Sequence, residues 1–141
     1  MSDLATVVAA LASRLTTGLS GTTIGGRVFG YGVDSVNPPT AVVVPAPEDP
    51  VIFGDTYDSR DSYNLVIKVL MGSADDRSNQ AELMSYLARS GTGSIFAAVE
   101  ADPTLSGAVS YAIVTRATAY GDIEWSGQIY YGAELIVEAL S

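Results

Sequence analysis

Residues 63–71 read YNLVIKVLM and carry the clearest strand pattern in the chain. Every second residue from Tyr63 to Met71 is large and apolar, which is the period of a strand with one buried face. The residues between them form a second face that is only partly apolar: Asn64, Val66, Lys68 and Leu70. This stretch therefore predicts a strand with one face in the core and the other face partly open.

Further elements follow on both sides of this strand. Helices are expected at 3–17, 75–89 and 94–101, and strands at 27–31, 40–44, 63–71, 109–120 and 128–139. The spacers between the first strands are too short for crossover helices, which favours antiparallel pairing. We therefore expect one α+β domain over residues 1–141, with a mixed, mainly antiparallel four- to five-stranded sheet and about three helices packed on it.

Several details of these elements can be tested. Ser2 is a plausible N-cap of the first helix, and Ser73 with Asp76 has the spacing of a capping box for the second. Ser94 is expected to cap the third, short helix. The second helix is expected to bury Ala81, Met84, Leu87 and Ala88. In the strand at 109–120, Tyr111 shares a face with Ile113 and is expected in the core, and residues 122–127 are expected to connect the last two strands as a hairpin.

The charge balance limits the partners of the chain. Its 141 residues carry a net charge of −9, and only seven residues are Lys or Arg. A protein that holds nucleic acid needs a clustered basic surface. Sequence-specific nucleic-acid binding is therefore not expected. An acidic surface would instead repel DNA that passes nearby.

The residue types needed for common catalytic sites are missing from the sequence. It contains no Cys and no His, so thiol nucleophiles, thiolate metal sites and imidazole bases are excluded. Carboxylate pairs such as Asp122 and Glu124 lie on a predicted turn with a single Trp nearby. We therefore expect a protein that is not an enzyme and binds no cofactor or metal. No signal peptide and no run of about 20 apolar residues are present, so no membrane contact is expected.

Residues 48–62, EDPVIFGDTYDSRDS, differ in kind from the rest of the chain. They combine acidic residues with an apolar triplet, and we interpret them as a long loop or a protruding hairpin that faces a partner. An alternative reading, weak cation binding by Asp55, Asp58 and Asp61, lacks the spacing of a calcium loop. The candidate partner-facing residues are Asp49, Val51, Ile52, Phe53, Asp55, Tyr57, Asp58, Arg60 and Asp61.

A second candidate surface comes from the partly open face of the sheet and from aromatic residues near the last hairpin. Tyr130 alternates with polar residues on its strand and should be partly exposed, and Tyr and Trp are favoured at interfaces. The candidate subunit-interface residues are Val66, Leu70, Trp125, Tyr130 and Ile136.

Residues 76–109 read DRSNQAELMSYLARSGTGSIFAAVEADPTLSGAV, a helix opening with Asp-Arg followed by Ser-Gly, a short Ala-rich helix and Ala-Asp-Pro-Thr-Leu. This run resembles the tail terminator proteins of long-tailed, non-contractile bacteriophages, especially those of Gram-positive hosts with GC-rich genomes. Three further features fit: the Asn37-Pro38-Pro39 lead-in, the Val-rich strand after it, and residues 131–138, YGAELIVE. The matching residues of the central run are Asp76, Arg77, Gln80, Leu83, Tyr86, Leu87, Ser90, Gly91, Glu100, Ala101, Asp102, Pro103, Thr104 and Leu105.

The resemblance implies a structural virion protein. Proteins of this family form a ring, typically hexameric, on the head-proximal end of the tail tube. The ring ends tube polymerisation and offers a docking surface for the head. The implied partners are further copies of the chain, the major tail tube protein and head-neck connector proteins, with genome DNA passing through unbound. The implied location is the virion tail, after assembly in the host cytoplasm.

Two alternatives remain at this point. The nearest is another head-tail connector or tail-completion subunit, which can share size, charge and ring symmetry with a terminator. The second is a monomeric binding module or an enzyme of a kind not recognised from its residues. A mass measurement separates the assembly proteins from the monomeric alternatives.

Overall fold

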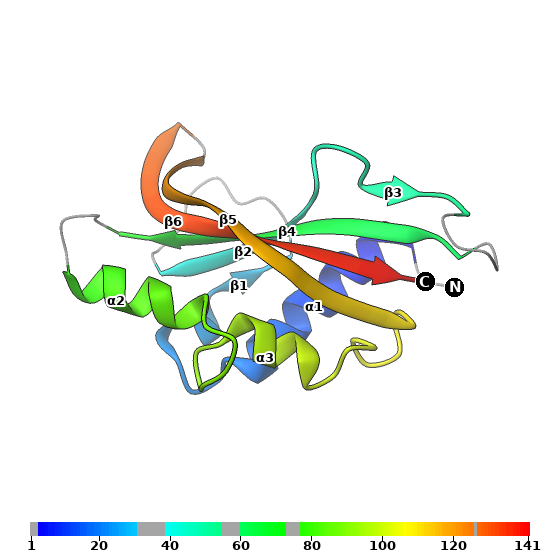
Figure 1. Cartoon of the computed structure of the whole chain (residues 1–141), viewed down its shortest axis with the longest axis horizontal. Coiled ribbons are helices and arrows are strands. Elements are labelled where there is room, and N and C mark those ends of the chain that lie inside the picture. Colours follow the sequence, from blue (N-terminus) through cyan, green and yellow to red (C-terminus); the bar gives the residue numbers. More distant parts are fainter. Residues whose placement is uncertain (1–2, 31–38, 55–59, 73–76, 126) are drawn as a thin grey trace.

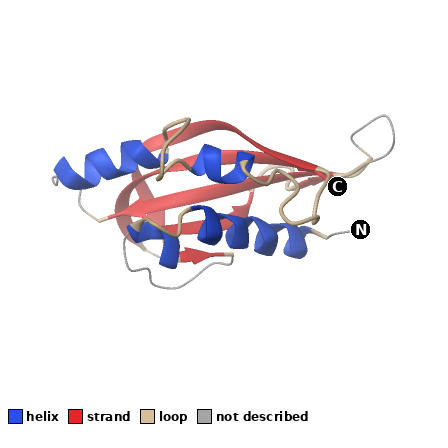
Figure 2. Cartoon of the chain, turned by 90° about the horizontal axis from the view of Figure 1, so that it is seen from below, coloured by secondary structure: helices blue, strands red, loops and turns tan. Residues whose placement is uncertain are grey.

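The computed structural model describes residues 3–30, 39–54, 60–72, 77–125 and 127–141. In this part of the chain, three α-helices lie on one face of a six-stranded sheet (Figure 2). The helices are α1 (Leu4–Gly18), α2 (Arg77–Tyr86) and α3 (Ile95–Glu100), with a 3-10 turn η1 at Thr23–Gly26. The strands are β1 (Val28–Phe29), β2 (Thr40–Pro45), β3 (Val51–Ile52), β4 (Ser62–Met71), β5 (Tyr111–Trp125) and β6 (Gln128–Leu140).

The sheet is mixed and mainly antiparallel, and the expected α+β class is confirmed (Figure 1). Its strand order is β1-β2-β4-β6-β5, and only β1 and β2 run parallel. The additional strand β3 pairs with Ser62 and Tyr63 at the start of β4. Because β6 pairs with β4 along its whole length, β3 occupies the other flank, past the end of β2. Strands β3 and β5 therefore lie at opposite edges of the sheet.

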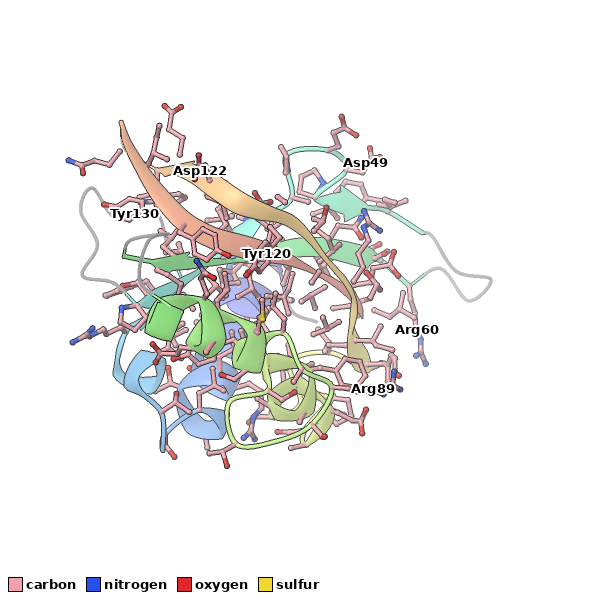
Figure 3. All side chains as sticks on the ribbon, turned by 60° about the vertical axis from the view of Figure 1, so that its left-hand side comes forward. Asp49, Arg60, Arg89, Tyr120, Asp122 and Tyr130 are labelled. Carbon is pink, nitrogen blue, oxygen red and sulfur yellow. The ribbon has the colours of Figure 1, made fainter. Side chains whose placement is uncertain are left out.

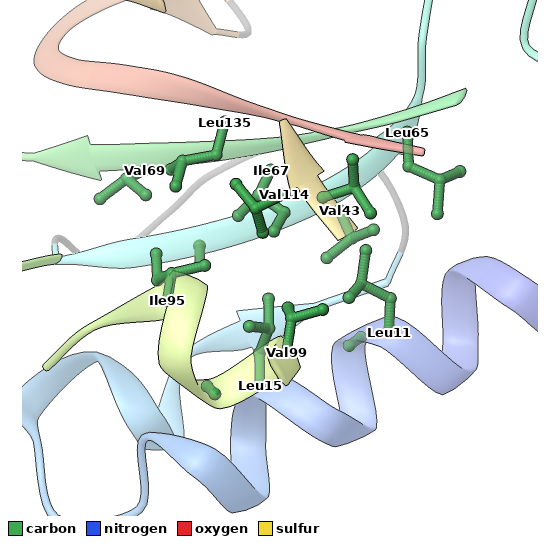
Figure 4. Close-up of a cluster of buried hydrophobic side chains, with 14 of the residues drawn as sticks. Leu11, Leu15, Val43, Leu65, Ile67, Val69, Ile95, Val99, Val114 and Leu135 are labelled. Atoms are coloured by element: carbon green, nitrogen blue, oxygen red, sulfur yellow. The ribbon is translucent and has the colours of Figure 1, made fainter. Parts of the chain in front are cut away.

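Strand β4 is the centre of the sheet, as its alternation predicts. The side chains of Tyr63, Leu65, Ile67, Val69 and Met71 are all buried, and they pack with residues of α1, α3 and β6 into the main core (Figure 4). The polar residue Ser62 and the Thr40 side chain on β2 are also buried. The period-two pattern thus identified the core face of this strand correctly.

Helix α1 lies where it was expected, and its buried residues include Val7, Val8, Leu11 and Leu15, which follow helical spacing. Asp3 caps its N-terminus, because its carboxylate accepts a hydrogen bond of 2.8 Å from the Thr6 N–H. The expected cap, Ser2, lies outside the described residues.

The buried face of α2 was predicted only in part. Among residues 80–86 the fully buried side chains are Leu83 and Tyr86, whereas Met84 is 58% exposed and Ala81 is also exposed. Leu87 packs against the main core, as expected. The α-helix ends at Tyr86, earlier than expected, so the half-buried Leu87 and Ala88 lie beyond its end. The Tyr86 hydroxyl donates to Glu82 Oε1 at 2.8 Å, which gives this large buried phenol a polar partner. Residues 73–76, which include the expected capping box, lie outside the described residues.

Helix α3 begins after Ser94, as predicted. The Ser94 hydroxyl accepts from the Ala97 N–H at 3.0 Å and donates to the Ala88 carbonyl at 2.6 Å. Ser94 is itself buried, so its side chain joins the start of α3 to the segment that follows α2.

Strands β5 and β6 form the expected hairpin, but β5 runs on to Trp125, so residues 122–125 of the expected connection belong to the strand. The expected burial of Tyr111 is wrong: its side chain is 48% exposed. Ala112 and Val114 are the buried residues of this stretch and pack against the helical side, so alternation turns Tyr111 and Ile113 to the other face.

Candidate assembly surfaces

In the described part of the acidic segment 48–62, β3 pairs antiparallel with the start of β4, which agrees with the hairpin reading of the sequence. Val51 and Ile52 of β3 pair with Tyr63 and Ser62, and the Asn64 side chain donates to the Asp49 carbonyl oxygen at 2.7 Å. The hairpin is therefore tied to the sheet at its base. Phe53 follows β3 and is 81% exposed, the largest exposure among the large apolar residues in the described part of the chain.

Several residues expected to face a partner from this segment have other positions. Val51 is half-buried and packs against the main core, and the Asp61 carboxylate accepts from the Gly54 N–H at 3.0 Å, closing the hairpin. The Asp61 N–H in turn donates to the Ser141 hydroxyl at 2.9 Å. Asp55, Tyr57 and Asp58 lie outside the described residues. Ile52, Phe53, Asp49 and Arg60 remain as exposed residues of the candidate surface.

The partly apolar second face of the sheet is not the open surface that the sequence suggested. Leu70 is 0% exposed and Val66 is 2% exposed, so neither can add contact area to a subunit interface. Leu70, Val42 and Ile123 form a second, smaller core, with Val44, Trp125 and Tyr130 packed against it. Ile123 and Trp125 belong to the far end of β5, which bends over this face together with β6 (Figure 1).

Glycine and two register shifts allow this bend. The pairing of β5 with β6 shifts between Val114 and Arg116 and again between Thr118 and Gly121. Gly121 has a φ of 134°, which favours glycine, and it pairs with Gly132 on β6. The covering of the second face thus depends on backbone irregularities that an alternating pattern does not reveal.

Trp125 also contacts the polar part of this face. The Lys68 ammonium lies 5.4 Å from the centre of the Trp125 ring, a cation–π contact that holds the hairpin end against β4. Trp125, Tyr130 and Ile136 are each half-buried, so their contacts within the chain use part of the surface expected to face a neighbour.

Other exposed apolar residues lie on the β5–β6 hairpin and were not identified from the sequence. Ile129 is 70% exposed, and Tyr111, Ile113 and Tyr120 are also exposed. The rings of Tyr120 and Tyr131 pack edge to face at 5.4 Å, and the Tyr131 hydroxyl donates to that of Tyr120. This hydrogen bond, with some burial, raises the pKa of Tyr131 to about 12. The alternating pattern of β5 divides its residues between two faces, but it does not say which of the two faces is exposed.

A groove runs along β5 where the edge strand faces α3 and the segment between α2 and α3; we call it the β5 groove. It consists of two adjoining hollows of about 60 and 190 Å³ that share Phe96 and Val114. The smaller hollow is lined by Val99 and Pro103 on one side and residues 111–114 on the other. The larger hollow carries Arg89 and Arg116, and the Arg89 guanidinium lies 4.7 Å from the centre of the Phe96 ring.

The described residues contain no group of three or more Asp or Glu side chains placed to hold a cation. None of the helices in the described ranges is long and apolar enough to cross a bilayer.

Comparisons with known proteins assign no family to this chain. No protein-family model matches the chain, and no curated protein matches it. The function of the chain is therefore inferred from its candidate assembly surfaces and from the resemblance of residues 76–109.

Proposed function

We propose that this chain is a structural subunit of a ring that caps the head-proximal end of a bacteriophage tail tube. In this role the ring ends polymerisation of the tube and presents a surface to the neck of the DNA-filled head. The main support for a ring is that exposed apolar side chains lie at opposite edges of one sheet. Phe53 stands beside β3, whereas Tyr111 and Ile113 lie on β5 at the other edge. A closed ring of identical subunits needs two different, complementary patches on each copy.

The segment that resembles tail terminators has structural roles in this fold. Leu83, Tyr86 and Leu105 are buried in the main core. The Asp102 carboxylate accepts from the Thr104 hydroxyl at 2.9 Å and from the Ser106 N–H at 3.0 Å. These hydrogen bonds hold the pKa of Asp102 below its usual value. In this chain the matching residues are thus engaged in packing and turns, so the resemblance supports a shared fold more directly than a shared partner.

Charge supports the same role. Each copy carries −9, so a hexameric ring would carry about six times that charge and would be strongly acidic. A channel through such a ring repels the phosphate backbone and lets DNA pass without being held. Acidic proteins are common, so the net charge supports the ring less than the exposed apolar residues at the two sheet edges do.

The experiment uses the major tail tube protein of the same phage. Purified tube protein is polymerised with and without the chain, and tube lengths and ends are measured by electron microscopy. We expect shorter tubes, each with a ring at one end. The matched variant is Phe53→Asp, which changes an exposed side chain of the proposed contact. Its melting temperature should be unchanged, so a weaker effect on the tubes would be a loss of assembly and not of folding. Tubes of unchanged length, with the chain monomeric at high concentration, would contradict the proposal. Binding to isolated necks without any effect on tubes would favour a connector role instead.

A further inference from the structure

The β5 groove combines apolar walls with positive charge at one end. Phe96 and Val99 of α3 supply apolar surface opposite β5, and Arg89 and Arg116 lie at the larger hollow. These are two of only seven cationic residues in a chain with sixteen acidic ones. Both arginines are exposed, so the end of the groove that they form suits an acidic segment with a large apolar side chain.

The β3–β4 hairpin has these properties. Phe53 projects from it, and Glu48 and Asp49 are exposed on the arm before β3. Figure 3 shows Asp49 beside β3 and Arg89 on the helical side of the molecule. The hairpin cannot fill the groove of its own chain, because β4 and β6 separate the two edges by about three strand spacings of ~4.8 Å.

The form of β5 argues against simple addition of a strand. A regular edge strand is a template for another strand, and register shifts interrupt such a template. The pairing of β5 with β6 is regular from Tyr111 to Val114, and its register then shifts between Val114 and Arg116. The groove beside it is therefore better suited to side chains than to a long backbone ladder.

We infer that the β3–β4 hairpin of one copy docks into the β5 groove of the next, with Phe53 against Phe96 and the acidic arm beside Arg89 and Arg116. This contact joins different surfaces on the two copies, so it repeats in one direction around a ring. The inference deepens the proposed function and depends on its ring, because it names the contact by which the subunits join.

The absence of cysteine makes a direct test possible, since any introduced thiol is the only one in the chain. Ile52→Cys supplies the donor and keeps Phe53 and the acidic arm. Glu100→Cys, exposed at the smaller hollow, supplies the acceptor. Ser13→Cys is the matched control acceptor, because it is an exposed helical residue of α1 outside the groove.

Each acceptor is mixed with the donor at equal concentration, alone and in the tube-assembly reaction, and oxidised briefly. The disulfide-linked heterodimer is measured on a non-reducing gel and identified by mass. We expect at least tenfold more heterodimer with Glu100→Cys than with Ser13→Cys. Adding Phe53→Asp to the donor should lower the yield to that of the control.

A charge exchange gives a second readout. Arg116→Glu should weaken self-association at least tenfold in sedimentation experiments, and adding Glu48→Arg should restore most of it. Oligomers that form with equal cross-linking yields for both acceptors would overturn the docking contact and leave the ring in place. A chain that stays monomeric both alone and with tubes would overturn the ring and the contact together.

Discussion

Gly132 on β6 passes so close to Val69 on β4 that a Cβ atom at Gly132 would lie 1.9 Å from the Val69 carbonyl oxygen. The Ile123 side chain would stand 3.3 Å from the same Cβ. This position therefore admits only glycine without movement of the backbone, and the bend of the β5–β6 hairpin over the second sheet face begins there.

The first prediction concerns this contact. Gly132→Ala should lower the free energy of unfolding by about 2–4 kcal/mol, because two paired strands must separate to admit the methyl group. Urea denaturation followed by circular dichroism measures the change. The control is Gly21→Ala, where the nearest atom to a new Cβ is 3.8 Å away and little change is expected. Equal stability of the two variants would contradict the close approach.

A second prediction concerns the small core on the second face. Trp125→Ala should lower the free energy of unfolding by about 1–3 kcal/mol, because it uncovers the residues around Leu70 and removes the contact with Lys68. Amide hydrogen exchange in residues 121–130 should become faster than in β4. Ile129→Ala, on the same hairpin but 70% exposed, should change the stability by less than about 0.5 kcal/mol. If both substitutions act alike, Trp125 does not hold the hairpin end.

The third prediction concerns pH. Burial, followed by the hydrogen bond to Glu82, raises the pKa of the Tyr86 phenol well above the 10.0 of an unperturbed tyrosine. The folded state thus holds this proton more tightly than the unfolded chain. Its contribution to stability is fully present below about pH 10 and is lost as the pH rises toward the folded-state pKa. Tyr86→Phe should therefore reduce the loss of stability between pH 8 and pH 11, measured by urea denaturation at each pH.

The control for this pH experiment is Tyr111→Phe, which changes an exposed tyrosine and leaves Tyr86 in place. That variant should keep the alkaline loss of stability seen in the unmodified chain. An undiminished loss in Tyr86→Phe would show that other groups cause it.

The fourth prediction separates folding from assembly. Replacing residues 53–60 by Asn-Gly keeps β3 and Asp61 and makes a short hairpin connection. Loop length has a small effect on stability, so the melting temperature should change by no more than about 3 °C. Under the proposed function, phage carrying this variant should produce tails of abnormal length or tails that fail to join heads. Normal, infectious particles would refute the role assigned to the hairpin.

The sequence predicted some elements better than others, for physical reasons that differ between residues. Ser94 was identified as a cap because its contact with Ala97 is local, three residues along the chain. The predicted buried face of α2 included Met84 in place of Leu83, because the choice between these two residues depends on where the helix meets the sheet. Both residues are apolar and adjacent, so spacing alone does not separate them.

The candidate surfaces also differ in how far the local sequence predicts them. Phe53 follows a Pro-bounded acidic stretch, and its exposure was expected from that local composition. The β5 groove was not foreseen, because it forms between residues 89–103 and residues 111–117 after the sheet has closed.

The sequence by itself determined the α+β class, the core face of β4 and the lack of thiol and imidazole chemistry. These follow from the period-two alternation of residues 63–71 and from composition, which act locally or on the whole chain. Only the tertiary structure decided that the second face of β4 is covered. Leu70 meets Ile123, more than fifty residues away, because Gly132 lets the hairpin bend, and no local pattern in either segment encodes that contact.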